Sequence, residues 1–489
     1  MTSEPDLAGR VVELARQHAG PDAEVEVLVT STDLALTRFA NSVIHQNVAD
    51  ATTRVRLRLH LSGRTAAGST TVLGADGLRD LVDRTIAAAR LCPPDHGWPG
   101  LTPPAATRPA ADVDEATARA EPAERARRVR DFVAAGEGLE AAGYCRTVRR
   151  SAAFANSAGH AAYGHAADAA MDGIVRYAGA DGVARLASSR LAGIDGAVLG
   201  ARAAAKARAG AGPVELPPGE YEVVLEPAAV ADVLANLAYY GFNGKDHIER
   251  QSFAEVGTAQ FDPSITMVDD APGTPALPFD TEGTPRGRLV LVEDGITRAV
   301  THNRRTAAEA GTASTGHELT ASSFGPMPLS LSLLPAGATA GPADRFPAGD
   351  ADRPGADRPG AVSAGPPAEA AGLAEAAGPA ADAEVSGLLT GVRRGLLVSD
   401  LWYTRVLDPL TLVVTGLTRN GVWLIEDGEV TRPVRDFRFT QSYPRALAPG
   451  AVLGLGRAAV RQPDSWDSAW WTAPAVRLAR WNFTGGAAG

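Results

Sequence analysis

The chain has 489 residues, of which 45% are hydrophobic and 21% are charged. This length exceeds what one ordinary hydrophobic core supports, so we expect two or more domains. The net charge of -10 argues against nucleic acid as the main partner. The two cysteines, Cys92 and Cys145, exclude a four-cysteine zinc site and give no support to a disulfide framework.

The N-terminal sequence Met-Thr-Ser-Glu-Pro-Asp is acidic and lacks the apolar centre of a signal peptide. No apolar run is long enough to span a bilayer. Because few cysteines suit a reducing compartment, we expect a cytoplasmic protein with no membrane segment.

The first 91 residues predict an antiparallel sheet with helices on it. Between the two helices, strands are expected, and residues 53–61 alternate so that Val55, Leu57, Leu59 and Leu61 point inward. Arg54, Arg56, Arg58 and His60 would then point outward. The predicted elements are a helix at 5–19, strands at about 24–30, 33–40, 43–48 and 53–61, a further strand after Ser62-Gly63, and a helix at 75–91 stopped by Pro93-Pro94.

From about residue 120 to 210 we expect helices alternating with strands. Residues 145–156 and 160–166 flank a Ser-Ala-Gly turn and predict a hairpin. A Gly/Pro-rich connector near 210–218 places a domain boundary there, which gives an N-terminal α+β domain at 1–212 and a C-terminal domain at 213–489.

The C-terminal domain is predicted to be β-rich, with stacked hairpins and a few helices. Residues 289–300 and 422–434 repeat one pattern, an Asp-Gly turn between apolar strands, which is a strong hairpin signal. Residues 335–384 are mostly Ala, Gly, Pro and Asp and predict a disordered insertion. The end of the chain is aromatic, with Trp466, Trp470, Trp471 and Trp481. The predicted fold class is therefore α+β.

The nine histidines do not form a recognisable zinc motif. A zinc hydrolase needs closely spaced ligands on one helix, a third ligand and a carboxylate. His317-Glu318 opens a His-Glu-x-x-His pattern, but Ala321 stands at its end. His160 and His165 fall on opposite faces of the predicted hairpin.

Two polar groups are candidates for substrate contact. His247 and Glu249 would share one face if their segment were a strand, where they could hold a metal or a peptide terminus; the alternative is a solvated loop pair. Asp280 and Glu282 precede the first Asp-Gly hairpin, and Arg304 and Arg305 follow it, so hairpin closure brings the four together. They would form either a salt-bridged loop clasp or a wall that contacts substrate.

Other chemistry has little support in the sequence. No Gly-x-Ser-x-Gly elbow, phosphate-binding Gly-x-x-x-x-Gly-Lys-Ser/Thr loop or strand-linked Gly-x-Gly-x-x-Gly is present. Cys145 lies on an apolar strand and is interpreted as a buried structural thiol.

An ordered series of motifs resembles the TldD/PmbA metallopeptidase family. The segments are 37–46 (Thr-Arg-Phe-Ala-Asn-Ser-Val-Ile-His-Gln), 279–285 (Phe-Asp-Thr-Glu-Gly-Thr-Pro), 290–295 (Val-Leu-Val-Glu-Asp-Gly), 302–306 (His-Asn-Arg-Arg-Thr), 314–316 (Ser-Thr-Gly) and 425–434. The resemblance covers almost the whole chain apart from residues 335–384.

The resemblance also exposes a departure. Members of the TldD type carry His-Glu-x-x-x-His on the helix after the strand that corresponds to 221–225, with a cysteine ligand further on. Here Asn236, Leu237 and Gly241 align with those three positions, and no cysteine follows Cys145. The chain is therefore similar to the metal-free TldE (PmbA) branch.

The resemblance implies a non-catalytic subunit that binds no metal itself. Its expected partner is a TldD-like subunit holding zinc in a shared cavity, and the expected substrates are unfolded peptides. A peptide-binding homodimer without proteolysis and a hydrolase with unconventional ligands such as His247 and Glu249 stay open as alternatives.

Overall fold

The computed structural model describes residues 3–108, 113–270, 276–320, 322–337, 385–463 and 469–486. Most of the predicted insertion at 335–384, together with Ala321 and Trp466, lies outside the described residues. Within this part of the chain, no helix is both long and apolar enough to cross a membrane.

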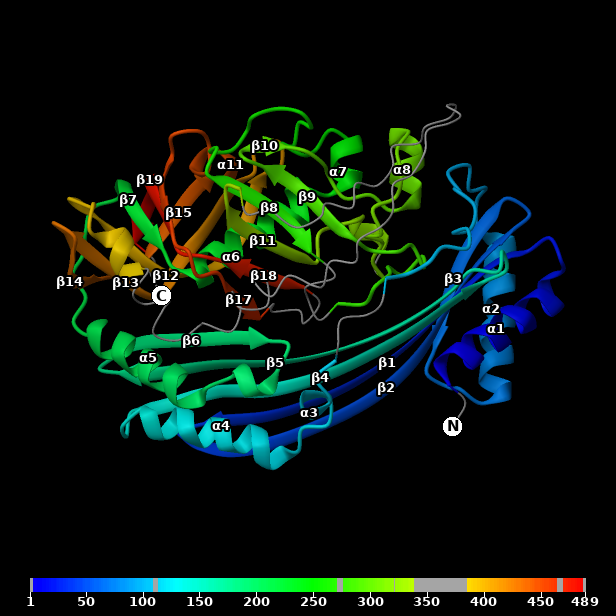
Figure 1. Ribbon diagram of the computed structural model, residues 1–489, viewed down its shortest axis with the longest axis horizontal. Helices are drawn as coiled ribbons and strands as arrows, with labels where there is room; N and C mark the ends of the chain where they lie inside the picture. The colour runs from blue at the N-terminus through cyan, green and yellow to red at the C-terminus, as the bar shows by residue number, and fades with distance from the viewer. Residues whose placement is uncertain are drawn as a thin grey trace, which may run out of the picture.

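The N-terminal half is one six-stranded antiparallel sheet in the order β3-β2-β1-β4-β5-β6 (Figure 1). Its strands are β1 (Glu24–Ala40), β2 (Val43–Leu61), β3 (Arg64–Thr70), β4 (Glu140–Asn156), β5 (Ala161–Tyr177) and β6 (Ala180–Ser188). Its helices are α1 (Glu4–Ala19), α2 (Ala75–Leu91), α3 (Glu115–Ala118), α4 (Pro122–Ala135) and α5 (Gly196–Ala209), with a 3₁₀ turn at Leu191–Gly193.

Two separate helix pairs cover the two ends of this sheet (Figure 1). α1 and α2 pack over the inward face of β2, where Val55, Leu57 and Leu59 are fully buried as predicted, whereas Leu61 is partly exposed. At the other end, Phe132 of α4 packs on Phe39 of β1 with ring centroids 5.5 Å apart. The long strands therefore span two small cores.

The strands are longer than the sequence patterns predicted. The expected strands at 24–30 and 33–40 are one continuous strand, β1, and those at 43–48 and 53–61 are one strand, β2. Unbroken pairing between β1 and β2 from Glu24 to Arg38 explains this, because no glycine or proline interrupts either segment. The predicted alternation after residue 120 is also wrong: α4 and α5 flank three consecutive strands. The hairpin between β4 and β5 is confirmed.

The C-terminal half contains two further sheets. The first has the order β10-β9-β8-β11-β18-β17, and the second contains β12-β7-β19-β15-β13-β14, with β16 paired to β19. The first sheet consists of β8 (Ile265–Asp270), β9 (Arg288–Glu293), β10 (Ile296–Thr297), β11 (Ser330–Pro335), β17 (Val460–Pro463) and β18 (Trp470–Ala473). The second consists of β7 (Gly219–Leu225), β12 (Arg394–Asp408), β13 (Val413–Glu426), β14 (Glu429–Val434), β15 (Phe437–Ser442), β16 (Val452–Leu455) and β19 (Val476–Gly486).

An additional pairing between β12 and β13 closes the second sheet into a ring of five strands, β12-β7-β19-β15-β13. Ring closure satisfies the backbone groups that an open edge would expose. Trp481 and Phe439 are buried inside the ring, and Trp470 and Trp471 are buried in the neighbouring sheet. The helices of this half are α6 (Pro227–Asn236), α7 (Gly244–Ile248), α8 (Arg304–Ala310) and α11 (Tyr443–Ala446), with a 3₁₀ turn at Ser322–Phe324.

Both predicted Asp-Gly turns are present. Asp294 and Gly295 have φ of 47° and 81°, and Asp427 and Gly428 have φ of 49° and 85°. Two consecutive left-handed residues are what a two-residue hairpin turn requires. The α+β class with a β-rich C-terminal half is thus confirmed, while the division at residues 212 and 213 stays a prediction.

Candidate functional site

Helix α6 and the turn after it occupy the place where the family motif would carry its metal ligands. α6 starts with Pro227 at its first position, and a single π turn, Leu237–Gly241, follows it. Such turns insert one extra residue into a helix and are often found at functional sites. Most of the segment is apolar and buried, although Tyr240 is exposed, so packing rather than propensity holds it in place.

The three positions aligned with the metal motif all have other roles. The Asn236 amide donates to the Asp232 carbonyl oxygen at 2.9 Å, and Leu237 is fully buried in the core. A Cβ added to Gly241 would lie 2.3 Å from the Phe253 ring, so no side chain fits there. The residues present therefore do not fit a zinc ion. Among the described residues, no group of three or more His, Cys, Asp or Glu side chains could hold a metal.

Asp232 is the centre of a partly buried polar network that the sequence did not predict. Its two carboxylate oxygens accept hydrogen bonds from Thr404 Oγ1 at 2.8 Å and from Tyr443 Oη at 2.9 Å. Asn236 Nδ2 also reaches this carboxylate, at 3.2 Å. Burial raises the pKa of Asp232 to about 6 and Asp400 adds to the shift, although the hydrogen bonds from the two hydroxyls oppose it.

A bulge in β12 positions Thr404 for this contact. The pairing of β12 with β13 shifts register between Trp402 and Arg405, and Tyr403 has a left-handed φ of 54°. An extra residue in one strand re-aims the neighbouring side chains, and Thr404 is thereby directed inward onto Asp232. The only signal in the sequence is a single carboxylate on a mostly apolar helix, and the two hydroxyl groups that it binds lie more than 170 positions away.

Of the four residues that the sequence predicted to meet, the structure brings three together: Asp280, Glu282 and Arg304. The Asp280 carboxylate accepts the backbone N–H groups of Glu282, Thr284 and Glu318, each at 2.9 Å. Glu282 in turn accepts the backbone N–H of Arg304 at 3.0 Å. Asp280 and Glu282 therefore shape the loop that receives the start of α8.

Arg305 does not join this group. Its guanidinium donates to both carboxylate oxygens of Asp95 at 2.9 Å, in the segment after α2. The Arg304 side chain also reaches into the N-terminal half, where it donates to Thr102 Oγ1 at 3.1 Å and to the Pro99 carbonyl at 3.3 Å. Both arginines thus tie α8 to the N-terminal half.

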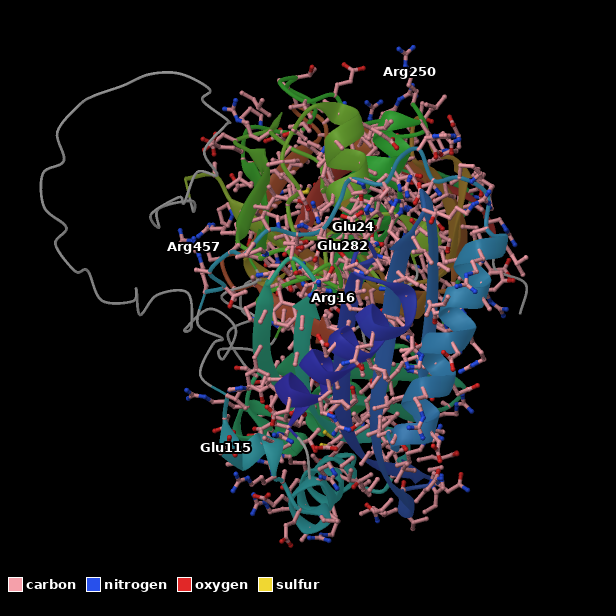
Figure 2. The ribbon with its side chains drawn as sticks, turned by 90° about the vertical axis from the view of Figure 1, so that its right-hand side faces the viewer. Arg16, Glu24, Glu115, Arg250, Glu282 and Arg457 are labelled. Carbon is pink, nitrogen blue, oxygen red and sulfur yellow. The ribbon has the colours of Figure 1, made fainter. Side chains whose placement is uncertain are left out.

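Arg58 of β2 completes the connection between the two halves. Its guanidinium contacts Glu26 of β1 and, at 2.9 Å, Glu282. In Figure 2 Glu282 lies where the N-terminal strands meet the C-terminal half. The face of β2 predicted to point outward is therefore covered at Arg58, because the second half packs against it. We call Glu26, Arg58, Glu282 and Arg304 the clasp.

Two further buried carboxylates, those of Asp280 and Glu318, lie near Glu282 of the clasp. Burial raises the pKa of Glu26 although Arg58 opposes the shift, and burial together with Glu282 raises the pKa of Asp280. The pKa of Glu318 is raised for the same two reasons. The two carboxylates that contact Arg58 depend on its charge, since buried anions need a paired cation.

His247 and Glu249 are not arranged as a strand pair. His247 lies in α7 and Glu249 is its C-terminal cap, and residues two apart on a helix do not face each other. His247 lies near His302, whose pKa falls to about 4, mainly through burial. Glu249 is exposed, and Arg250 beside it projects into solvent in Figure 2.

The histidines of the incomplete motifs are buried in structural positions. His317 Nε2 lies 3.5 Å from the Asp269 carboxylate, and both side chains are fully buried. Burial raises the pKa of Asp269, but His317, Arg286 and the Ser330 N–H together outweigh it and bring the pKa to about 2. His160 contacts the Gly283 carbonyl at 2.8 Å, and the two halves meet there as well. Cys145 is buried, and burial raises its pKa to about 12, which makes it unreactive.

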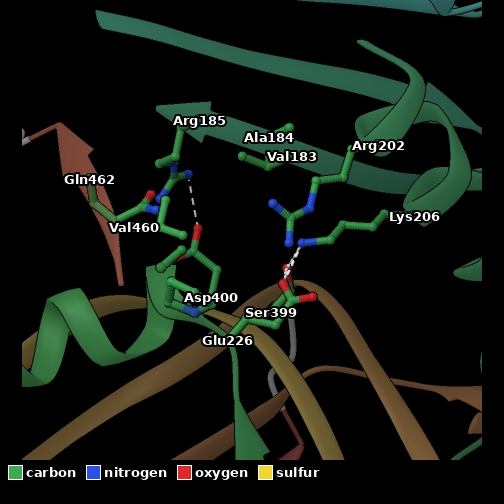
Figure 3. Close-up of a pocket in the computed structure, with 12 residues that line it drawn as sticks. Val183, Ala184, Arg185, Arg202, Lys206, Glu226, Ser399, Asp400, Val460 and Gln462 are labelled. Atoms are coloured by element: carbon green, nitrogen blue, oxygen red, sulfur yellow. Dashed lines mark hydrogen bonds and ion pairs between the residues drawn. The ribbon is translucent and has the colours of Figure 1, made fainter. Parts of the chain in front are cut away.

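A small pocket lies at the junction of the halves, at the start of α6 (Figure 3). Lys206 of α5 contacts Glu226, the residue before α6, and Ser399 Oγ donates to the same carboxylate at 2.8 Å. Arg185 of β6 contacts Asp400 at 2.9 Å. Lys206 and Arg185 thus contact carboxylates of the C-terminal half, so the pocket is a second ionic connection between the halves.

Comparison with known proteins relates this geometry to a family. The PmbA/TldA metallopeptidase C-terminal domain matches residues 218–340 and 370–485. A metalloprotease from Archaeoglobus fulgidus is 32% identical over 100 residues, which are 19% of this chain and 23% of that protein.

Solved structures extend the likeness in fold to nearly the whole chain. TldE from Thermococcus kodakarensis has a TM-score of 0.78 at 17% identity, covering 98% of this chain and all of that one. A proposed modulator of a DNA gyrase from Thermotoga maritima has a TM-score of 0.74 at 16% identity, covering 98% of this chain and 99% of that one. At identities this low, the structural likeness shows that the fold is shared.

Proposed function

The chain belongs to the TldD/PmbA family of metallopeptidase-like proteins, and on that premise we propose that it is a non-catalytic subunit of a zinc peptidase complex. Its partner in this proposal is a paralogue that carries His-Glu-x-x-x-His on the equivalent helix and holds the zinc. The complex would process unfolded peptides in the cytoplasm.

One observation supports the proposal: other contacts occupy the three positions at the end of α6 and in the turn after it that align with the metal motif. The Phe253 ring takes the space that a side chain at Gly241 would need, and Leu237 is part of the core. Asn236 is tied to Asp232. Binding a cation here would require repacking of the helix as well as new ligands, since interiors are close-packed.

A subunit without metal can still contribute to peptide processing. An extended peptide can bind through main-chain hydrogen bonds to a sheet edge, which gives affinity with little sequence preference. In this proposal the present chain forms part of the wall of the cavity that holds the zinc. The enclosed cavity admits unfolded chains and excludes folded proteins by size.

The test is to measure zinc content and peptidase activity of this chain alone, of the paralogue alone and of the two together. We expect less than one zinc per isolated chain and no activity until the paralogue is added. One tightly bound zinc, or activity of the metal-stripped chain, would contradict the proposal and favour a hydrolase with unconventional ligands such as His247 and Glu249. If the chain forms a homodimer that binds peptides but does not bind the paralogue, the alternative of a peptide-binding homodimer without proteolysis is favoured.

A further inference from the structure

An exposed aromatic surface lies on the outside of the β12 bulge. Four of the fifteen large apolar side chains that are exposed in the described part of the chain fall within nine positions. They are Trp402 (50% exposed), Tyr403 (63%), Leu407 (60%) and Leu410 (54%). Single exposed apolar residues are ordinary, but a contiguous group marks an interaction site.

Strand pairing extends this surface across three strands of the ring. Trp402 pairs with Leu417 of β13, and Leu417 pairs with Arg438 of β15. Residues directly opposite in a sheet lie on the same face, so the three side chains form one row. The inward face of these strands is core, as buried Leu401 and Phe439 show. We call Trp402, Tyr403, Leu407, Leu410 and Leu417, with the arginines beside them, the Trp402 face.

Arginines surround the aromatic residues. Arg419 stacks over the Trp402 ring at 4.6 Å and Arg405 over the Tyr403 ring at 4.2 Å. With Arg438 they place three cations on one face of a chain whose net charge is -10. The neighbouring Asp408 carboxylate is held by the Leu410 N–H and the Thr411 hydroxyl. Tyr, Trp and Arg are the residues that most often dominate binding energy at protein interfaces.

The charge of this face decides between a second copy and a different partner. In a two-fold dimer the same patch would meet itself, which would set arginines against arginines. Like charges across an interface cost binding energy, whereas carboxylates on the other side would gain it. The face therefore fits a partner with an apolar centre and acidic residues around it.

The Trp402 face is also continuous with the candidate site. Thr404, in the same bulge, points inward to Asp232 on α6, while Trp402 and Tyr403 are exposed. A protein bound here would contact the outer side of the β12 bulge, whose inner side contacts α6 through Thr404 and Asp232. We infer that the Trp402 face is the docking surface for the zinc-bearing paralogue, whose contacting surface carries carboxylates opposite Arg405, Arg419 and Arg438. This inference rests on the proposed function.

The experiment measures binding of the full-length chain to the purified paralogue by calorimetry and by light scattering after size exclusion. Trp402→Ala is expected to weaken binding about 30-fold or more, as for central aromatic residues at interfaces. Arg419→Glu should also weaken binding to the paralogue, and the loss of affinity should be larger at low salt than at high salt. Leu453→Ala is the matched control, because Leu453 is 47% exposed on β16 of the same half, and its affinity should stay within about twofold of wild type.

Each outcome bears on a distinct claim. Unchanged thermal unfolding of the variants shows that they fold, because the substituted side chains are exposed. If wild type binds the paralogue and both Trp402→Ala and Arg419→Glu bind equally well, the docking assignment is wrong while the proposed function stands. If wild type does not bind the paralogue, the proposed function fails and this inference fails with it. If Trp402→Ala instead abolishes self-association of the isolated chain, a second copy occupies the face and the inference is overturned.

Discussion

Gly241 shows how one position without a side chain decides what the helix after β7 can do. The Phe253 ring that lies against it is itself packed edge-on against Phe242 and Phe261, with ring centroids 5.9 Å away in each case. Because three rings support one another, the contact cannot be relieved by turning a flexible side chain.

We predict that Gly241→Ala destabilises the protein by about 1–3 kcal/mol, the usual cost of overpacking a core. The control is Gly9→Ala in α1, where an added Cβ meets nothing within 4 Å. That change should be neutral or stabilise by up to about 1 kcal/mol, because alanine favours a helix. Denaturant unfolding of both variants measures the two effects. A neutral Gly241→Ala would mean that space for a ligand exists at this position.

Asp232 gives stability a defined dependence on pH. Its folded pKa of about 6 lies above the ordinary 3.8, so the folded state binds the proton more tightly than the unfolded state. Its contribution is therefore fully present below pH 4 and is lost as the pH rises to about 6, by up to roughly 3 kcal/mol.

We expect Asp232→Asn to remove this part of the pH dependence. From pH 4 to pH 6 the free energy of unfolding of wild type should fall relative to that of the variant. Above pH 6 the difference between the two should stay constant. Urea unfolding at several pH values gives the difference directly, and subtraction cancels other raised groups such as Asp436, which also has a pKa of about 6. A constant difference across this range would show that Asp232 ionises normally.

Among the elements, β2 contributes to two parts of the structure, one on each of its faces. Its inward residues build the core under α1 and α2, and Arg58 on its other face contacts Glu26 and Glu282. Removing one member of a buried pair leaves the remaining charges without compensation, which costs more than the pair itself contributes.

Arg58→Ala is therefore predicted to lower the free energy of unfolding by about 3–5 kcal/mol. Arg54→Ala, on the same strand and the same face but exposed, should change it by less than about 0.5 kcal/mol. Thermal and chemical unfolding of both variants provide the test. Equal effects of the two substitutions would show that the clasp is not a buried ion pair in solution.

Local patterns could predict most elements but not their junctions. The Asp-Gly turns, α2 and the inward face of β2 follow from short-range rules, and the structure has them. The continuity of β1 was missed because its polar middle section is stabilised by pairing with β2 and not by its own pattern. Arg58 was assigned to solvent because alternation identifies two faces of a strand but does not say what covers the second.

At the scale of the whole molecule, the candidate site depends on contacts between distant segments. Asp232 meets Thr404 and Tyr443, and Glu282 meets Arg58, across separations that no motif spans. The sequence resemblance could locate the altered helix by aligning Asn236, Leu237 and Gly241. It could not show that packing excludes a side chain at Gly241, nor that β12 carries a bulge.

The segment predicted to be an insertion offers a last test at this scale. It lies outside the described residues for most of its length, and the two parts of the family match, 218–340 and 370–485, leave out residues 341–369. It connects β11 to β12, which belong to different sheets. We predict that deleting 341–369 leaves binding to the paralogue unchanged, because the docking surface inferred above lies in β12, β13 and β15.

The same deletion should leave stability unchanged or raise it slightly. It roughly halves the number of residues between Pro335 and Arg394, and each halving of a connection lowers the entropic cost of closing it by about 0.6 kcal/mol. Calorimetric unfolding and a binding titration on the deleted chain measure both quantities. A drop in affinity of tenfold or more would show that the segment contacts the partner, because a loop that only connects two strands cannot change binding by that amount.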